Sequence, residues 1–303
     1  MNRPSEAAPS RSLVVAAFAV VYLVWGSTYL AIRVASESMP PFLMAGVRFL
    51  VAGLLMYGWA RTRGAPAPPG RSWRAALILG ALFLLGGNGG VVWAEQFVPS
   101  GLAAVLVALM PIWTAVVEWV RPGGHRPGLM TTAGLLTGFA GVALLLAPGS
   151  SGAAVDPVGA VVLILASLSW AIGSVFSKGM PLPASGAQSS GMQMLAGGAL
   201  LVLAGLGTGE AAAVDFAAIT PRSLAALLYL ITFGSLLGFG AFTWLLRATT
   251  PARVATYAYV NPVVAVFLGW ALLGEPLGPR ELAAAAVIVG GVALITTAKL
   301  RAA

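Results

Sequence analysis

Three tryptophans lie near the middle of long apolar stretches, where an indole ring could take part in binding. These are Trp25, Trp113 and Trp170. A buried indole N–H needs a hydrogen-bond partner, so each ring either packs against a neighbouring helix or lines a cavity that contains polar groups. Both interpretations are open for all three. Where such rings line a cavity, their faces bind apolar side chains and delocalised cations.

Hydroxyl side chains follow two of these tryptophans at helical spacing. Thr28 lies three positions after Trp25, and Ser174 lies four positions after Trp170. Residues three or four positions apart share one face of a helix. Each hydroxyl therefore either joins the same cavity or makes a hydrogen bond to a neighbouring helix.

Two asparagines add amide groups in similar positions. Asn261 follows Tyr257 by four positions and directly precedes Pro262, which removes a backbone hydrogen bond and favours a kink. Asn88 lies between two pairs of glycines, residues 86–87 and 89–90, where helices can approach closely. Cavity lining and an interhelical hydrogen bond are both open for each asparagine.

These residues predict one substrate-binding cavity of aromatic, amide and hydroxyl groups, without a fixed charge at its centre. The candidates are Trp25, Thr28, Asn88, Trp113, Trp170, Ser174, Tyr257 and Asn261. Such a cavity suits neutral or zwitterionic solutes with an apolar side chain, or delocalised cations. A phosphorylated substrate would need paired Arg or Lys groups deep inside, which the sequence lacks. The chemistry favours amino acids over nucleotide sugars and sugar phosphates.

Charged side chains inside or next to the apolar stretches form a second set, because charge inside a membrane is costly and usually functional. The candidates for gating or charge pairing are Arg33, Arg48, Glu95, Glu118, Lys178 and Glu275. We expect Arg48 and Glu95 to pair, as a static brace, a gate or a proton site. Arg33 has Glu275 as a candidate partner, and Lys178 has Glu118. Alternatively, both bases extend to the membrane interface.

The composition places all these residues in a membrane protein. Of the 303 residues, 59% are hydrophobic and only 9% are charged, whereas soluble domains contain about 25% charged residues. The net charge of +8 comes mainly from basic residues at the ends of apolar stretches, where they set membrane orientation, so it does not indicate nucleic-acid binding. Cysteine is absent, which excludes disulfides and thiolate metal sites. We expect no metal and no cofactor.

Ten apolar stretches are long enough to cross a bilayer, whose core of about 30 Å takes about 20 helical residues. They lie near residues 13–33, 40–60, 74–96, 99–120, 129–147, 157–178, 186–207, 222–247, 251–273 and 280–299. Most of the 17 basic residues fall on the same side as the N-terminus, and most acidic residues fall on the other side. Because basic residues favour the cytoplasm, we expect both termini there.

The two halves of the chain repeat one pattern. A shift of 145 positions places Trp25 on Trp170 and Arg33 on Lys178, and a shift of 151 places Pro111 on Pro262. Because five spans is an odd number, two such halves cross the membrane in opposite directions. Inverted repeats of this kind are typical of alternating-access transporters.

Several short motifs resemble those of the EamA-type drug/metabolite transporter family. They are Trp25–Tyr29 with Arg33, Pro40-Pro41 to Arg48-Phe49, Glu95 to Ala104, Ser169–Ala171, and Tyr259–Val263 with Gly274-Glu275. The likeness covers both halves and, within the family, looks closest to exporters of amino acids and metabolites. It implies ten helices, cytoplasmic termini and export of amino acids, other metabolites or cationic drugs. The first half departs from the family pattern, because Glu118-Trp119 stands where a Gly-Glu pair is common.

We therefore predict an all-α integral membrane protein of ten transmembrane helices, built as two inverted five-helix repeats, residues 1–150 and 151–303. The expected function is alternating-access export of small metabolites across a bacterial inner membrane. Amino acids with neutral, hydrophobic or aromatic side chains are the expected substrates, together with related drugs.

Three other functions were weighed against this one. Efflux of drugs and organic cations is the first alternative, and a membrane channel is the second. An enzyme would need a His, Cys or clustered-carboxylate site, and none stands at a spacing that supports one. The expected partners are a small-molecule substrate and the lipid bilayer, without nucleic acid, and the chain acts as a monomer or homodimer.

Overall fold

The computed structural model describes residues 10–124, 126–146, 156–249, 254 and 256–302. These residues form helices, turns and loops and contain no strand, which confirms the all-α prediction. Helical segments that are long and apolar enough to cross a bilayer are α1 (Arg11–Ala35), α2 (Pro41–Thr62), Gly70–Ala94, Ser100–Val120, α8 (Pro157–Ser177), α9 (Gly186–Gly207) and Pro221–Leu245. The chain is therefore a multi-pass membrane protein.

Three further helices lie in the remaining predicted spans. They are α7 (Leu129–Leu146), α13 (Tyr257–Leu273) and α14 (Pro279–Ala302). The ninth span was predicted from residue 251, whereas α13 begins at Tyr257; residues 250–253 and 255 lie outside the described part of the chain. The predicted boundary between the two halves, at residues 150 and 151, also lies outside it.

Two of the long segments contain a π-helix in their middle. The π-helix η1 (Ala81–Gly89) joins α3 (Gly70–Gly80) to α4 (Gly90–Ala94). In the same way, η3 (Leu230–Phe239) joins α10 (Pro221–Tyr229) to α11 (Gly240–Ala248). A π-helix bonds residue i to residue i+5 and often occurs at a functional site. The two π-helices are therefore candidates for parts of a functional site.

Proline shapes two other segments. The segment Ser100–Val120 divides into α5 (Ser100–Val107) and α6 (Met110–Val120), and Pro111 stands in the first turn of α6. Proline is tolerated there because the first N–H groups of a helix have no partner within it. Pro262, by contrast, lies inside α13.

Local capping explains where several helices begin and end. The side chains of Ser10, Asp156, Ser185 and Thr220 accept hydrogen bonds from backbone N–H groups in the first turns of α1, α8, α9 and α10. Such caps satisfy donors that the helix itself leaves unpaired. Gly274, with a φ of 65°, ends α13 in the left-handed conformation that glycine favours.

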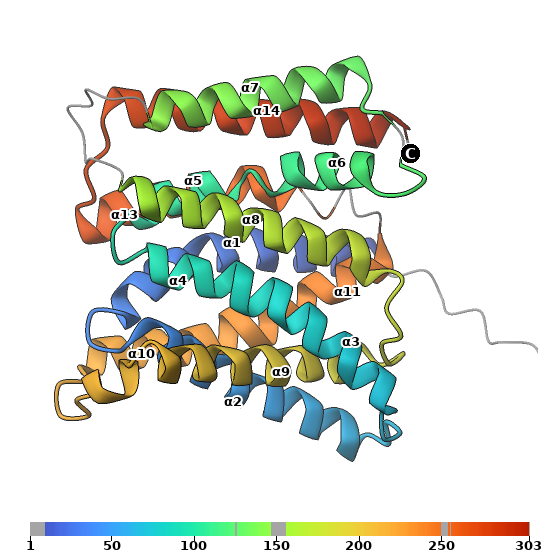
Figure 1. The fold of residues 1–303 in the computed structure, drawn as a ribbon, viewed down its shortest axis with the longest axis vertical. Helices are drawn as coiled ribbons and strands as arrows, with labels where there is room; N and C mark the ends of the chain where they lie inside the picture. The colour runs from blue at the N-terminus through green and yellow to red at the C-terminus, as the bar shows by residue number, and fades with distance from the viewer. Residues whose placement is uncertain (1–9, 125, 147–155, 250–253, 255, 303) are drawn as a thin grey trace, which may run out of the picture.

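Two close helix pairs stand near opposite ends of the long axis of the molecule (Figure 1). α2 packs along α9, and α7 packs along α14. A Cβ atom added at Gly198 would lie 2.9 Å from the backbone nitrogen of Leu50, and one at Gly291 would lie 2.6 Å from that of Gly138. Small residues thus let the two backbones of each pair approach closely, as in many membrane helix pairs.

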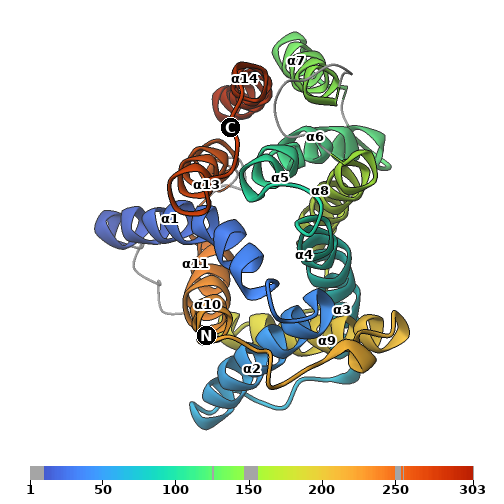
Figure 2. The ribbon, with the colours of Figure 1, turned by 90° about the vertical axis from the view of Figure 1, so that its left-hand side faces the viewer.

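The other helices lie between these two pairs (Figure 2). α1 packs against α13 and against the α10–η3–α11 segment. α8 packs against the α5–α6 segment, η1 and α4. This arrangement brings Trp25 of α1 and Trp170 of α8 into contact.

Candidate functional site

A cavity in the middle of the molecule collects most of the predicted binding residues. Its wall includes Trp25, Thr28, Asn88, Trp170, Tyr257 and Asn261. It also includes Tyr29, Ile32, Arg48, Phe49 and Phe239, which were not among the predicted binding residues. Both halves of the chain therefore contribute to one wall, through α1, α2, η1, α8, η3 and α13.

Aromatic rings form a continuous surface beside the cavity. The rings of Trp25 and Trp170 meet edge to face with centroids 5.8 Å apart, and Tyr257 meets Trp25 in the same way at 5.3 Å. Phe242 lies 4.9 Å from Trp25, and Phe83 lies 4.9 Å from Trp170. Ring pairs at these distances are stabilised by their quadrupoles as well as by burial.

Glycines of the two π-helices leave room for the tryptophan rings. A Cβ atom added at Gly87 would lie 2.9 Å from Cε3 of Trp170, and one at Gly238 would lie 2.6 Å from Nε1 of Trp25. The indole N–H of Trp25 donates to the backbone carbonyl of Gly234 at 3.2 Å. The rings therefore lie directly against the backbones of η1 and η3.

Two amide groups in the wall have unused hydrogen-bonding capacity. The Oδ1 atoms of Asn88 and Asn261 are buried, and neither has a partner among the residues that the structure describes. Thr28 differs, because its hydroxyl donates to the carbonyl of Trp25 within α1 at 2.7 Å. An unpaired buried acceptor destabilises a protein, so a solute that supplies a donor would gain from contact with either asparagine.

Two predicted binding residues lie away from the cavity wall. The ring of Trp113 packs edge to face on Phe139 of α7, with centroids 5.4 Å apart. Ser174 donates to the carbonyl of Trp170 at 2.9 Å. Neither residue lines the cavity. For Trp113 the structure favours helix packing, and for Ser174 it favours a hydrogen bond within its own helix.

The cavity was predicted to have no fixed charge at its centre, and the structure adds one charged side chain to its wall, that of Arg48. The Arg48 side chain is only 3% exposed. Its Nε donates to Oγ of Ser235 at 2.8 Å, and its Cζ lies 4.6 Å from the centroid of the Phe49 ring. The guanidinium group is thus buried and held in place from two sides.

Arg48 and Glu95 do not form the predicted pair. Arg48 is bonded to Ser235 instead, because η3 packs against α2 and brings that hydroxyl within reach. Glu95 is buried, and neither of its carboxylate oxygens has a hydrogen-bond partner within the described ranges. The brace that we expected between α2 and the end of α4 is therefore absent.

Arg33 and Glu275 also take partners other than the expected ones. Arg33 donates from Nη1 to the backbone carbonyl of Glu95. The carboxylate of Glu275 accepts from the backbone N–H groups of Ser100 at 2.8 Å and Gly101 at 3.1 Å. A carboxylate at that position stabilises the N-terminus of α5. Both residues fasten helix ends instead of forming a pair with each other.

Lys178 and Glu118 lie outside the cavity wall. Lys178 is exposed at the C-terminal end of α8, and Glu118 is half-buried near the end of α6. Their position agrees with a role at one end of the bundle and not with direct contact to a solute in the cavity.

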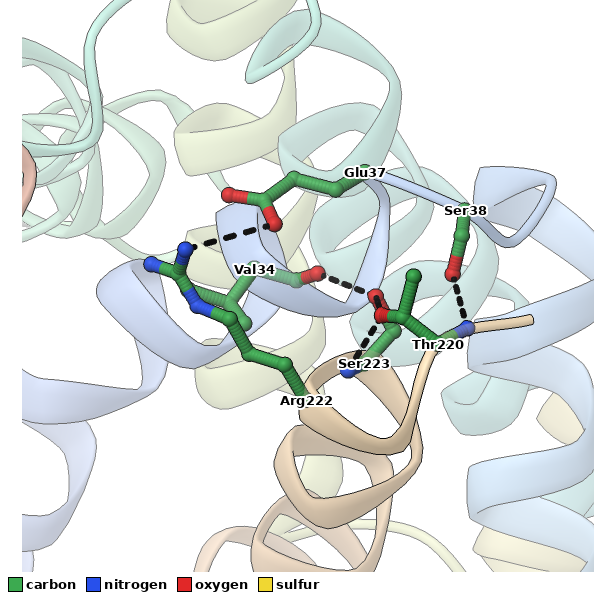
Figure 3. A network of polar contacts seen from close by, with 6 residues as sticks. All are labelled: Val34, Glu37, Ser38, Thr220, Arg222 and Ser223. Atoms are coloured by element: carbon green, nitrogen blue, oxygen red, sulfur yellow. Dashed lines mark hydrogen bonds and ion pairs between the residues drawn. The ribbon is translucent and has the colours of Figure 1, made fainter. Parts of the chain in front are cut away.

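A polar network fastens the end of α1 to the start of α10 (Figure 3). The hydroxyl of Ser223 donates to the carbonyl of Val34 at 2.8 Å. Beside it, Arg222 and Glu37 form a partly exposed ion pair at 3.8 Å. The serine bond is fully buried and is the stronger constraint, because exposed ion pairs contribute little to stability.

A second serine makes a similar bond elsewhere in the fold. Ser72, near the start of α3, donates from its hydroxyl to the carbonyl of Pro181, which follows α8 in the chain, at 2.7 Å. Ser72 and Ser223 are both buried and lie 151 positions apart. They are therefore related by the shift of 151 positions that also places Pro111 on Pro262.

Some wall residues could have been found from the sequence, and others could not. Tyr29 and Ile32 lie four and seven positions after Trp25, so helical spacing places them on the same face. Phe239 ends a π-helix, where α-helical spacing does not hold. No pattern in the sequence indicates it.

Comparisons with known proteins agree with one another. The model of the EamA-like transporter family matches residues 12–147 and 157–297. The uncharacterized inner membrane transporter YedA of Escherichia coli (strain K12) is 41% identical over 281 residues, which are 92% of this chain and 89% of the relative. The uncharacterized transporter YvbV of Bacillus subtilis (strain 168) is 27% identical over 288 residues, 95% of this chain and 92% of the relative.

A solved crystal structure has the same fold. It is 22% identical in sequence and has a TM-score of 0.67, covering 96% of this chain and 99% of its own. At that level of identity the likeness extends to the fold alone.

Proposed function

Because the chain belongs to the EamA-like transporter family, we propose that it exports small amphipathic metabolites across the inner membrane, chiefly neutral, hydrophobic or aromatic amino acids. One observation supports this substrate class. Trp25, Trp170 and Tyr257 surround a cavity in which the amide oxygens of Asn88 and Asn261 have no described partner. The rings suit an apolar side chain, and the amides suit an ammonium group.

The same wall argues against the efflux of organic cations as the main activity. A cationic drug would gain from the aromatic faces, but it would share a buried cavity with the guanidinium group of Arg48. Like charges in such an environment repel strongly, because little water screens them. A solute that carries a negative group avoids this repulsion.

Purified protein in liposomes is expected to take up labelled L-phenylalanine and L-leucine faster than liposomes without protein, because both solutes combine an apolar side chain with an ammonium group. A sugar phosphate, whose dianion would require paired basic groups, serves as the control solute. Failure to move any amino acid or related amphipathic solute in a broad panel would contradict the proposed function.

We propose that the chain crosses the membrane ten times, as two inverted repeats of five helices, residues 1–150 and 151–303, with both termini in the cytoplasm. The helix contacts of α1 in the first half have counterparts in the contacts of α8 in the second half. α1 contacts η3 and α11, while α8 contacts η1 and α4. Trp25 lies against Gly238, and Trp170 lies against Gly87. The cavity is built within one chain, so a monomer suffices, whether or not two copies associate.

In this topology the two serine bonds lie at opposite ends of the cavity. The bond from Ser223 to the carbonyl of Val34, at the end of α1, lies on the outer side. The bond from Ser72 to the carbonyl of Pro181, after α8, lies on the inner side. Alternating access requires one end to open while the other stays closed. We propose that these bonds hold the two ends closed and break in turn.

Loss of the Ser223 bond and loss of the Ser72 bond are expected to shift the accessibility of the cavity from outside in opposite directions. Each hydroxyl contributes about 1 kcal/mol of net stabilisation, which corresponds to about a fivefold change in population. Because the chain has no cysteine, Thr28→Cys provides a single cavity thiol that an impermeant maleimide can label from outside. Ser223→Ala is expected to raise the labelling rate, and Ser72→Ala is expected to lower it.

Thr62→Ala is the matched control, because the Thr62 hydroxyl is exposed and donates within its own helix to the carbonyl of Trp59 at 2.8 Å. It should leave the labelling rate unchanged. Changes in the same direction for both serine variants, or no change in either, would argue against paired closure.

A further inference from the structure

Arg48 has an orientation that leaves one nitrogen of its guanidinium group without a hydrogen-bond partner among the described residues. Nε donates to Oγ of Ser235 at 2.8 Å, and a Cβ atom added at Gly234 would lie 2.9 Å from Nη2. The edge formed by Nε and Nη2 therefore faces η3. Nη1 is buried and has no hydrogen-bond partner among the described residues. The Arg48 residue as a whole lines the cavity, so part of the hydrogen-bonding capacity of this buried cation is unused beside the cavity.

No described carboxylate compensates this charge by direct contact. The carboxylate oxygens of the nearest predicted partner, Glu95, have no hydrogen-bond partner, Arg48 included. Arginine keeps its proton in proteins, and a buried charge without a partner is strongly destabilising. Such a group is stabilised when a ligand supplies the missing anion.

The other half of the chain shows what this position looks like without a charge. A shift of 145 places Arg48 on Gln193, which is also buried in a helix. The Nε2 group of Gln193 donates to the carbonyl and to the hydroxyl of Ser189, both at 3.2 Å. Gln193 therefore has its partners within α9, whereas Arg48 has an unused donor at the cavity.

We propose that the guanidinium group of Arg48 binds the carboxylate group of the exported solute and so makes this protein specific for apolar carboxylates, amino acids among them. This inference rests on the proposed function and specifies the part of the solute that the cavity recognises. The carboxylate lies at Arg48, the apolar part lies against Trp25 and Trp170, and an ammonium group, where present, donates to Asn88 or Asn261.

The geometry fits a carboxylate better than a phosphate. Phosphate dianions are usually held by two or more basic groups, and Arg48 is the one basic residue in the described wall of the cavity. A carboxylate carries a single charge and needs a single guanidinium group. The ring of Phe49, whose centroid lies 4.6 Å from Cζ, attracts that group and helps to hold it in place.

The test compares L-phenylalanine with L-phenylalaninamide, which keeps the ring and the ammonium group but has no carboxylate. Binding of both to the purified full-length protein is measured by calorimetry. The wild-type protein is expected to bind the acid about tenfold to a hundredfold more tightly, as for a buried charge-assisted hydrogen bond. Arg48→Gln is expected to remove this preference, because the acid loses its ion partner while the amide, whose ammonium group the guanidinium group repels, binds no more weakly than before.

Two further variants control the result. Arg74→Gln removes the same charge from an exposed position and should keep the wild-type preference. Arg48→Lys keeps the charge but loses the planar fork and should keep part of the preference. Glutamine at position 48 matches the residue that the fold already holds at position 193, so Arg48→Gln should preserve the folded protein.

Several results would overturn the inference. Equal weakening of both ligands in Arg48→Gln would make Arg48 a structural residue only, and an unchanged preference would remove it from recognition altogether. A wild-type protein that binds acid and amide equally would also overturn it; if that protein still transports amino acids, the proposed function stands. If it binds neither ligand and transports no solute, both proposals fail together.

Discussion

Replacing Trp170 with alanine is expected to reduce amino-acid flux in proteoliposomes about a hundredfold, because its ring is shared by three aromatic contacts in the cavity wall. It meets Trp25, Phe83 and Phe242 at centroid distances of 5.8, 4.9 and 6.2 Å. Truncation of a tryptophan that dominates a binding surface typically costs at least about 2 kcal/mol of binding free energy, and a loss of about 3 kcal/mol corresponds to more than a hundredfold in affinity.

Trp119→Ala is the matched control, because Trp119 is 44% exposed near the end of α6 and contributes nothing to the wall. It should transport at the wild-type rate. Trp170→Phe keeps a ring at the site and should retain part of the flux, which separates loss of the cavity surface from loss of folding. Wild-type flux in Trp170→Ala would remove the aromatic surface from the mechanism.

The second large effect concerns the assembly of α2 and α9. Gly191→Leu is expected to abolish the folded protein in detergent, because a Cβ atom there would lie 2.7 Å from the backbone nitrogen of Tyr57 and 3.0 Å from its Cα. Backbone atoms cannot move aside as a flexible side chain can, so the two helices must separate. Even modest overpacking lowers the free energy of unfolding by about 1–3 kcal/mol. A whole leucine side chain at a backbone contact lowers it further.

Gly58→Leu provides the control within the same helix pair. No atom lies within 4 Å of a Cβ added at Gly58, so its leucine should be tolerated. Thermal unfolding in detergent, followed by size-exclusion chromatography, compares the two variants. A Gly191→Leu protein with the wild-type unfolding midpoint would show that α2 and α9 are not packed as described.

The helices could be predicted from the sequence because their signals are local. Apolar stretches interrupted by proline and glycine place segments such as α8, where the predicted span 157–178 and the helix Pro157–Ser177 nearly coincide. Charge and length act residue by residue along the chain, so a neighbouring helix is not needed to interpret them. The same reasoning selected Trp25 and Trp170, which both line the cavity.

Depth alone did not determine which way a side chain faces. Trp113 was predicted at the same depth as the other two tryptophans, yet its ring packs on Phe139 of α7 and the residue does not line the cavity. The rotation of a helix about its axis is set by its packing partners. The two π-helices add a further difficulty, because bonding from i to i+5 changes the phase of the faces that follow.

The partners of the charged residues could not be predicted either. Arg48 bonds to Ser235, which lies 187 positions later in the chain. Glu275 caps α5 from a segment 175 positions after Ser100. These contacts depend on how the two halves interlock, and pairing the opposite charges that lie inside or next to the apolar stretches gives the wrong partner in both cases.

Solute counterflow tests the central claim most directly. Liposomes that contain the purified protein are loaded with unlabelled L-phenylalanine and diluted into a trace of the labelled amino acid. A carrier with one site that faces each side in turn exchanges internal for external solute, so we predict transient accumulation of label inside to a concentration above that outside. Equilibration without such an overshoot, for phenylalanine and every other amino acid tested, would identify a channel or an inactive protein and contradict the account.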